Sequence, residues 1–259
     1  MTVPTILKSE TAQCSEHGQY HKHLVESFIG DRIWQGCPRC QFDAVHSPDD
    51  AIYKPAAAVR DARDLNARLI ASDIPLRFRK ATLDNYQTIT SPAQQAIALR
   101  QCRDYAQGFE ANWNVGRSMM LLGGLGTGKT HLGCAIAQHA IREFRAVARY
   151  TSALSIIRDV KSTFAKDAEL TETKIYEALS TPDLLIVDEV GVQNGSDFER
   201  QVLFETINSR YERLQPTIVI SNLSILAMRK CLGDRVVDRL SDHDGPAVLF
   251  NWASARGEA

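Results

Sequence analysis

Short apolar runs alternate with longer stretches of helical periodicity over most of the chain. The predicted strands lie at residues 118–122, 147–152, 183–188, 216–221 and 247–252. The clearest helical stretches lie at residues 91–109, 129–144 and 197–214. Strands that are apolar throughout are typical of a parallel sheet buried on both faces, and intervening helices supply the cover. The pattern therefore predicts an α/β fold with helices flanking a parallel sheet.

The pattern is different ahead of this region and predicts three parts. Residues 1–50 are rich in Cys, His and Gly and have little apolar periodicity, which suits a small metal-binding N-terminal module. Residues 51–90 form a linker and helical lead-in, in which Pro75 bars a continuous helix. Residues 91–259 then form the α/β domain, with Ser91 as the N-cap of its first helix and Pro92 at the first helical position.

Composition narrows the classes of protein that fit. The 259 residues carry a net charge of −1, so any contact with nucleic acid must come from a local patch. No apolar run approaches the roughly 18 residues that a membrane span needs, and the first residues do not resemble a secretory signal. The six cysteines are not spaced as a disulfide framework. We expect a cytoplasmic protein without a membrane partner.

The strongest motif is GGLGTGKT at residues 123–130, which fits the P-loop pattern G-x-x-x-x-G-K-[ST]. Glycines let successive backbone N–H groups surround a phosphate, and the following helix directs its positive end at the same anion. Lys129 would neutralise the β- and γ-phosphates, and the Thr130 hydroxyl would join a Mg²⁺ shell. The predicted nucleotide contacts are Gly123, Gly124, Leu125, Gly126, Thr127, Gly128, Lys129, Thr130, His131 and Asp188.

Two acids follow the apolar run at residues 184–187 and extend the nucleotide site. Because ligands sit at the carboxyl ends of parallel strands, Asp188 is placed to hold Mg²⁺ and Glu189 to orient an attacking water. The sequence DEVG also satisfies a loose D-x-x-G element of GTPases, but the guanine-reading N-K-x-D motif is absent from the sequence. The nucleotide is therefore predicted to be ATP.

Polar residues farther along the chain complete the predicted catalytic set. Asn222 also follows an apolar run, where an amide reaches both the γ-phosphate and the lytic water; the alternative is a cap of the helix that starts near Ser224. Arg235 and Arg239 lie four residues apart on one helical face. They are either solvated surface charges or arginines presented outward to a neighbouring subunit.

An ordered set of motifs carries a family resemblance. The segments GxxGTGKTHL, LLIVDEVG, SN, GDRVVDRL and FNWASAR resemble those of the bacterial DnaC-type helicase loaders, which are AAA+ ATPases. The resemblance runs from about residue 60 to residue 256 and implies a P-loop AAA+ core with a five-stranded parallel sheet. It implies that Asn222 is sensor 1, Arg239 the arginine finger and Arg256 sensor 2, and Arg235 could share the work of the finger. The IstB-type transposition helper ATPases share much of this set.

Two pairs of metal-type ligands stand near the start of the chain. Cys14 with His17 and Cys37 with Cys40 are each separated by two residues, a spacing that suits one tetrahedral Zn²⁺. His21 or His23 could replace His17. Prophage-type relatives of the DnaC loaders carry similar Cys and His residues in their N-terminal segment, so the resemblance implies a zinc ribbon. It could dock to a helicase or to nucleic acid.

We therefore expect an ATPase that uses ATP, Mg²⁺ and Zn²⁺. By the resemblance, it loads a replicative hexameric helicase of the DnaB type onto single-stranded DNA and self-associates through the ATP site. The alternative is an IstB-like transposition helper acting on duplex DNA. A small-molecule kinase fits poorly, because it gives no account of residues 187–189, the helix with Arg235 and Arg239, or the front of the chain.

Overall fold

The computed structural model describes residues 5–26, 32–40, 53–165, 167–193 and 195–254. Its contacts divide the chain into two compact units, Met1–Asp64 and Leu65–Ala259. Helix α2, Tyr53–Ala71, contributes residues to both units. No helix in the described ranges is long and apolar enough to cross a membrane.

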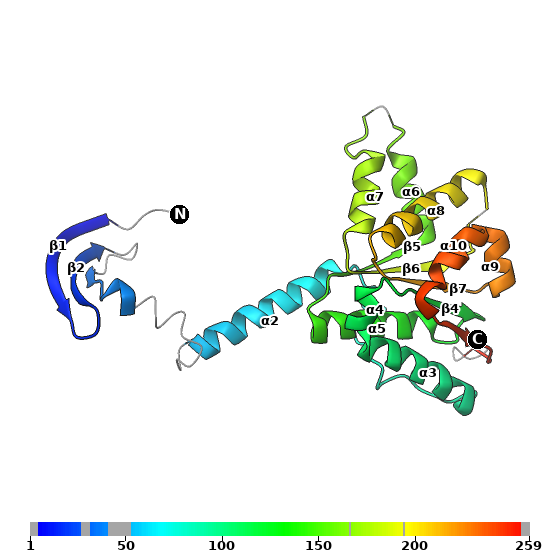
Figure 1. The fold of residues 1–259 in the computed structure, drawn as a ribbon, viewed down its shortest axis with the longest axis horizontal. Coiled ribbons are helices and arrows are strands. Elements are labelled where there is room, and N and C mark those ends of the chain that lie inside the picture. Colours follow the sequence, from blue (N-terminus) through cyan, green and yellow to red (C-terminus); the bar gives the residue numbers. More distant parts are fainter. Residues whose placement is uncertain (1–4, 27–31, 41–52, 166, 194, 255–259) are drawn as a thin grey trace. The chain divides into compact units, whose positions relative to one another are not determined.

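In the first unit, the described strands form a three-stranded antiparallel sheet (Figure 1). The strands are β1 (Thr5–Cys14), β2 (Gly18–Glu26) and β3 (Arg32–Trp34). Cys14 pairs with Gly18, so the connection between β1 and β2 is tight and contains His17. This hairpin brings His17 back beside Cys14.

In the second unit, the described strands form one five-stranded sheet in the order β5-β6-β7-β4-β8, with every neighbouring pair parallel. The predicted sheet is therefore confirmed. The strands are β4 (Met119–Gly123), β5 (Ala148–Ser152), β6 (Leu184–Val190), β7 (Thr217–Ser221) and β8 (Ala247–Phe250). The final strand ends at Phe250, two residues before the end of the predicted run, and Trp252 lies beyond it.

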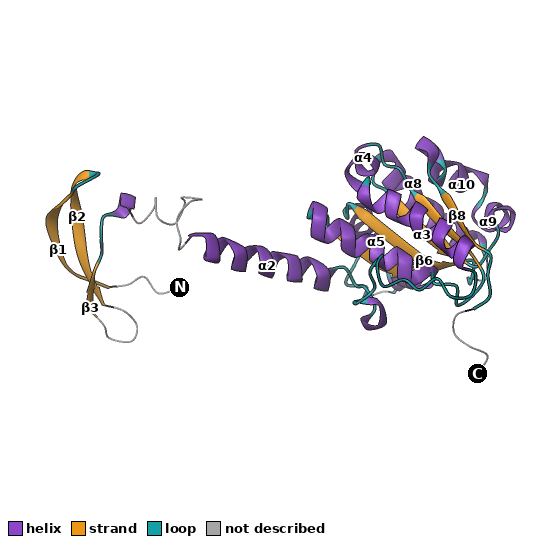
Figure 2. Ribbon diagram, turned by 90° about the horizontal axis from the view of Figure 1, so that it is seen from below, coloured by secondary structure: helices purple, strands orange, loops and turns teal. Residues whose placement is uncertain are grey.

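Helices cover both faces of this sheet (Figures 1 and 2). One face carries α3 (Pro92–Gln107), α4 (Phe109–Asn114) and α5 (Lys129–Phe144). The other carries α6 (Ala153–Ser162), α7 (Glu172–Ser180), α8 (Asp197–Glu212), α9 (Ile225–Leu232) and α10 (Asp234–Leu240). The described residues also form the short 3₁₀ turns η1 (Leu76–Phe78) and η2 (Asp242–Asp244).

The alternation of side chains along each strand explains the continuous apolar runs. On β4, Met119 and Leu121 pack into the core with α5, whereas Met120 and Leu122 pack into the core with α6 and α8. All four side chains are at most 1% exposed. Burying one such side chain contributes about 1.5–3 kcal/mol, so both faces need apolar residues.

The first residues of α8 and α3 differ in how their backbone N–H groups are bonded. Ser196 and Glu199 form a reciprocal capping box at the start of α8, which satisfies two terminal amides. Ser91 occupies the predicted N-cap position of α3, but its side chain makes no capping bond. Instead, the Gln95 amide oxygen accepts a hydrogen bond from the Ser91 N–H.

A buried arginine fixes the amino ends of the central strands. The Arg210 guanidinium is fully buried and donates to the carbonyls of Leu179, Pro182 and Pro216 and to the Thr217 hydroxyl. Burial lowers the pKa of Arg210 to about 9. Arg210 thereby joins the segments that lead into β6 and β7 and fixes the positions of these two strands relative to each other.

Candidate nucleotide site and metal centre

The P-loop connects the end of β4 to the start of α5. Gly123 has φ 138° and Gly128 has φ 94°, conformations that side chains with a Cβ rarely adopt. A Cβ on Gly123 would lie 2.3 Å from the Phe250 carbonyl oxygen, and one on Gly128 would lie 2.5 Å from the Tyr86 ring. These glycines let β8 and Tyr86 approach the loop closely.

The lysine of the motif is turned back onto its own loop. Lys129 Nζ donates to the carbonyl oxygens of Gly123 and Gly124 at 2.7 and 2.5 Å, and lies 3.3 Å from Thr127 Oγ1. Its side chain is 8% exposed and lines the cavity above the loop. A buried ammonium held by neutral carbonyls at the start of a helix is a site that favours an anion.

Asp188, on β6, lines the same cavity as the P-loop. Its Oδ2 accepts hydrogen bonds from Thr130 Oγ1 and from the Tyr150 hydroxyl, both at 2.8 Å, and its Oδ1 accepts the Glu189 N–H at 2.7 Å. The carboxylate is 5% exposed. A hydroxyl and a carboxylate oxygen this close form the hard oxygen set that Mg²⁺ prefers.

Tyr150 is a site residue that the sequence analysis missed. It lies on β5, next to β6, two residues before the Ser152 that pairs with Asp188. Burial and the charge of Asp188 raise the pKa of Tyr150, so its hydroxyl remains a hydrogen-bond donor at neutral pH. Only the pairing of two strands distant in the sequence reveals this contact.

Glu189 and Asn222 face the same cavity as Lys129 and Asp188. Both side chains are exposed, and Glu189 has φ 59°, an uncommon left-handed conformation for a residue with a Cβ. Asn222 follows β7, which lies between β4 and β6 in the sheet. The strand order thus places the amide between the P-loop and the two acids.

The cavity has a volume of about 250 Å³ and gathers most of the residues expected there. Gly123 and Gly124 do not line it and instead hold Lys129. The residues that the sequence analysis did not assign are Arg77, Phe78, Val192, Ile220 and Ser221. The donor set and the glycine loop fit a nucleoside triphosphate with Mg²⁺.

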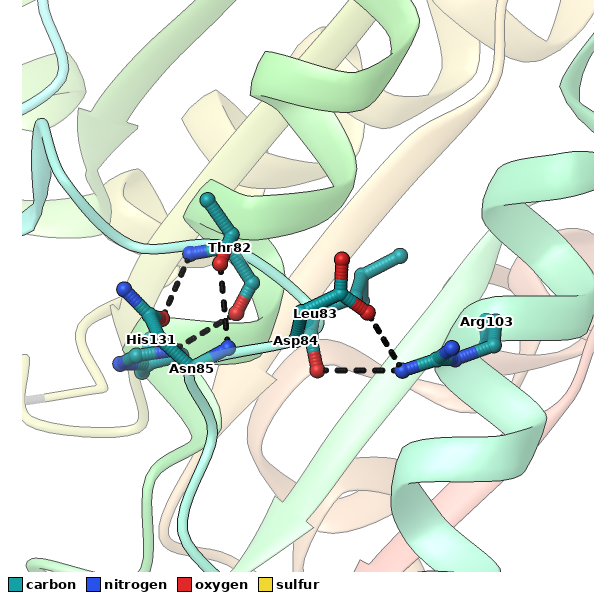
Figure 3. Close-up of polar contacts among 6 residues, drawn as sticks. All are labelled: Thr82, Leu83, Asp84, Asn85, Arg103 and His131. Carbon is teal, nitrogen blue, oxygen red and sulfur yellow. Dashed lines mark hydrogen bonds and ion pairs between the residues drawn. The ribbon is translucent and has the colours of Figure 1, made fainter.

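The lead-in segment reaches this cavity because α5 holds it. His131 Nε2 lies 3.0 Å from the Thr82 carbonyl, so His131 donates to the lead-in (Figure 3). The Gln138 amide donates to the carbonyls of Phe78 and Ala81 at 3.0 and 2.8 Å. These bonds place Arg77 and Phe78 along the cavity wall.

The lead-in also has its own local structure (Figure 3). Thr82 and Asn85 exchange two bonds, from Thr82 N–H to Asn85 Oδ1 at 2.9 Å and from Asn85 N–H to Thr82 Oγ1 at 3.1 Å. Arg103, on α3, donates to the Leu83 carbonyl and pairs with Asp84 at 2.9 Å. The turn is therefore fixed between α3 and α5.

Two aromatic side chains hold the P-loop from the side of the lead-in and of β8. The Tyr86 hydroxyl and the Trp252 Nε1–H both donate to the Thr127 carbonyl, at 3.0 and 3.1 Å. Burial raises the pKa of Tyr86 to about 12. The Trp252 ring packs on Phe250 with ring centroids 4.9 Å apart.

The two arginines of α10 have different surroundings. Arg235 is exposed, whereas Arg239 is half-buried with its guanidinium 5.0 Å from the Phe204 ring centroid and 5.5 Å from that of Tyr211. Within the described chain, Arg239 Nη1 is buried without a hydrogen-bond partner. Neither arginine lines the cavity of its own protomer. Arg256 lies outside the described residues.

Four N/S donors converge in the first unit. Cys14, His17, Cys37 and Cys40 place their ligand atoms within 4.8 Å of one another. Cys14 Sγ lies 3.5 Å from Cys40 Sγ, and His17 Nδ1 lies 3.2 Å from Cys40 Sγ. A tetrahedral zinc site with thiolate ligands has sulfurs about 3.8 Å apart, so the group fits Zn²⁺. His17 completes this group, whereas His23 Nδ1 lies 2.7 Å from the Ser9 hydroxyl.

Two cysteines of this group differ in the pKa of their thiols. Backbone N–H groups of Glu16 and His17 lower the pKa of Cys14 to about 6. The neighbouring Cys14 in turn raises the pKa of Cys40 to about 12. A bound cation would stabilise both thiolates together, as the crowding of the donors requires.

Proteins with similar sequences are named replicative helicase loader DnaC. The protein of Escherichia coli K12 is 34% identical over 162 residues, which cover 62% of this chain and 64% of that protein. The protein of Buchnera aphidicola subsp. Acyrthosiphon pisum is 31% identical over 179 residues, which cover 69% and 70%. The chain thus matches somewhat under two thirds of the length of the Escherichia coli protein.

A solved structure and a family model also match this chain. The crystal structure of a DnaC helicase loader is 23% identical, with a TM-score of 0.59 over 69% of this chain and all of that chain, and it shares the fold. The family model described as IstB-like ATP binding protein matches residues 50–245. This match spans well over half of the sequence, including the P-loop, Asp188 and α10. The chain therefore belongs to the family of IstB-like ATP binding proteins.

Proposed function

We propose that this protein is an ATP-driven loader that places a ring-shaped replicative helicase on single-stranded DNA. The observation that carries the proposal is the 31–34% identity to proteins named replicative helicase loader DnaC. The cavity between the P-loop and Asp188 supplies a nucleotide site with which such a loader could switch. We further propose that it acts in the cytoplasm, where chromosome replication takes place in bacteria.

In this proposal, the P-loop and the first turn of α5 bind the triphosphate. Lys129 exchanges its bonds to the Gly123 and Gly124 carbonyls for bonds to phosphate oxygens. Thr130 and Asp188 hold the Mg²⁺ that neutralises phosphate charge. Glu189 orients the attacking water and Asn222 senses the γ-phosphate, since both face the cavity.

Hydrolysis then requires a second copy of the chain. Arg235 and Arg239 lie on α10 away from the protomer's own cavity, so they serve a neighbouring protomer or none. The stacking of Arg239 on Phe204 and Tyr211 holds it on α8 in the isolated chain. We propose Arg239 as the arginine finger, with Arg235 beside it, and Arg256 as a sensor. ATP thereby favours one assembly state over another.

The front of the chain serves as the docking module in this account. A zinc site made by Cys14, His17, Cys37 and Cys40 joins the turn after β1 to residues 37–40 and stabilises a sheet with little core of its own. We propose the helicase as its partner. A nucleic-acid partner would instead give salt-dependent binding of this unit to DNA.

A second function has its own supporting observation. The matching family model is described as IstB-like ATP binding protein, which keeps open the alternative expected from the sequence, a transposition helper acting on duplex DNA. Loader activity predicts preference for single strands and capture of a hexameric helicase. Helper activity predicts ATP-dependent filaments on duplex DNA and no helicase.

The test is a pull-down with the full chain from bacterial cytosol, in parallel with ATP and with ADP. A hexameric helicase retained with ATP and released after hydrolysis supports loading, and Lys129→Ala should abolish the nucleotide dependence. Recovery of no helicase, together with ATP-dependent binding to duplex DNA, would favour the transposition helper.

A further inference from the structure

We propose that Tyr150 is a positioning residue for the metal-binding carboxylate of Asp188, so that its hydroxyl sets the affinity of the nucleotide site for Mg²⁺. The inference rests on the proposed Mg-ATP site and adds a residue from β5. The observation is the hydrogen bond from the Tyr150 hydroxyl to Asp188 Oδ2, 2.8 Å long.

Tyr150 is held in place by contacts other than Asp188. Its backbone N–H donates to the Ser72 carbonyl at 2.7 Å, and its ring packs against the core between α5 and the sheet. The adjacent Arg149 pairs with Asp73 at 3.5 Å. The phenol therefore approaches Asp188 from a fixed backbone, as a supporting group must if it is to orient a ligand.

The two side-chain hydrogen bonds that Asp188 Oδ2 accepts connect Tyr150 to the metal site. Thr130 and Tyr150 both donate to this oxygen, and Glu189 N–H donates to Oδ1. A hydroxyl has one hydrogen and two lone pairs, so Thr130 would hold Mg²⁺ through its oxygen while its hydrogen stays on Asp188. Tyr150 has no ligand role of its own, and its bond would orient Oδ2 with or without the ion.

A simpler explanation is that a half-buried hydroxyl needs a partner and finds Asp188. That explanation predicts that removing the hydroxyl changes stability alone. The positioning role predicts a specific loss of Mg²⁺ affinity, since supporting bonds to metal ligands are typically worth about tenfold or more. A measurement of Mg²⁺ affinity therefore distinguishes the two explanations.

The experiment titrates Mg²⁺ into the full chain with a fluorescent ATP analogue, after a first measurement in EDTA. Tyr150→Phe should keep the nucleotide affinity in EDTA and raise the Mg²⁺ concentration for half-maximal enhancement about tenfold. Tyr105→Phe is the control, because the Tyr105 hydroxyl is buried and donates to the Arg117 carbonyl, not to a residue of the nucleotide site. Thermal unfolding of both variants measures the stability effect separately.

A double-mutant cycle tests whether the effect passes through Asp188. In an Asp188→Ala background, which lacks the acceptor, Tyr150→Phe should cause no further shift in the Mg²⁺ midpoint. An unchanged midpoint in the single variant, an equal loss in EDTA, or a full shift in the Ala background would overturn the inference alone. Absence of nucleotide binding by the wild-type chain would instead overturn the proposed function, and the inference with it.

Discussion

The Tyr86 hydroxyl donates a hydrogen bond to the Thr127 carbonyl, 3.0 Å away, and so joins the lead-in segment to the tip of the P-loop. Forty-one residues separate the two along the chain. Trp252 donates to the same carbonyl from beyond β8. The conformation of the phosphate-binding loop therefore depends on segments on either side of it in the sequence.

Tyr86→Phe tests this support. The variant removes one of two donors to the Thr127 carbonyl, and a net loss of about 1 kcal/mol in the free energy of unfolding is expected. Nucleotide affinity should fall several-fold because the loop is less ordered. Combining it with Trp252→Phe should cost more than the sum of the single changes, because the carbonyl then loses both donors. Strict additivity in thermal unfolding and in nucleotide binding would contradict a shared support.

Gly128→Ala should abolish nucleotide binding. The new Cβ would lie 2.5 Å from the Tyr86 ring, at a φ of 94° that alanine rarely adopts. Either the P-loop changes its conformation or the Tyr86 ring moves away from it. Gly195→Ala is the control, since φ there is also positive, at 76°, while a Cβ would meet nothing within 4 Å. Equal affinities of the two variants for a fluorescent ATP analogue would show that the close packing on Gly128 does not matter.

Arg239→Ala should leave ATP binding intact and remove the hydrolysis that assembly or DNA stimulates. An arginine that stabilises the charge of a phosphoryl transition state is worth about 10³-fold or more in rate. The same change removes the stacking on Phe204 and Tyr211, worth about 0.5–1 kcal/mol of stability.

Arg235→Ala is the comparison, because this side chain is exposed and should leave the unfolding temperature unchanged. If stimulated hydrolysis is lost in Arg235→Ala and kept in Arg239→Ala, the exposed arginine is the finger. Normal stimulated hydrolysis in both variants would show that the α10 arginines are surface charges.

Removal of the metal should unfold the first unit and spare the second. Metal analysis is expected to find about one zinc per chain, lost in Cys37→Ser/Cys40→Ser. A chelator should abolish the circular dichroism of the β1–β3 sheet while the melting of the α/β unit stays the same. Cys231→Ser is the control, since Cys231 lies on α9 and should leave zinc content unchanged. A folded wild-type chain without metal would exclude the zinc site.

The hydrophobic pattern of the sequence is enough to predict the α/β core. Apolar runs such as residues 184–187 predict strands buried on both faces, and the two core clusters on either side of β6 confirm this. Because the carboxyl ends of parallel strands meet at one edge of a sheet, the sequence also predicts that Asp188 and Asn222 lie near the P-loop. Both indeed line one cavity with Lys129.

Contacts between distant segments could not be predicted from the sequence. Tyr150 on β5 has the pattern of an ordinary aromatic strand residue, and only the pairing with β6 puts its hydroxyl on Asp188. The choice among His17, His21 and His23 likewise needs the hairpin register, which pairs Cys14 with Gly18. The sequence does not indicate that Arg239 stacks on α8, because Phe204 lies thirty-five residues earlier.

Calorimetric titration of Mg-ATP into the wild-type chain, with thermal unfolding of the same samples, tests the nucleotide site most directly. The account predicts saturable binding of about one nucleotide per chain and a higher unfolding temperature, as binding to the native state requires. Lys129→Ala should lose both effects, whereas Lys174→Ala, altered at an exposed position on α7, should keep them. No heat and no thermal protection at saturating Mg-ATP would contradict the account.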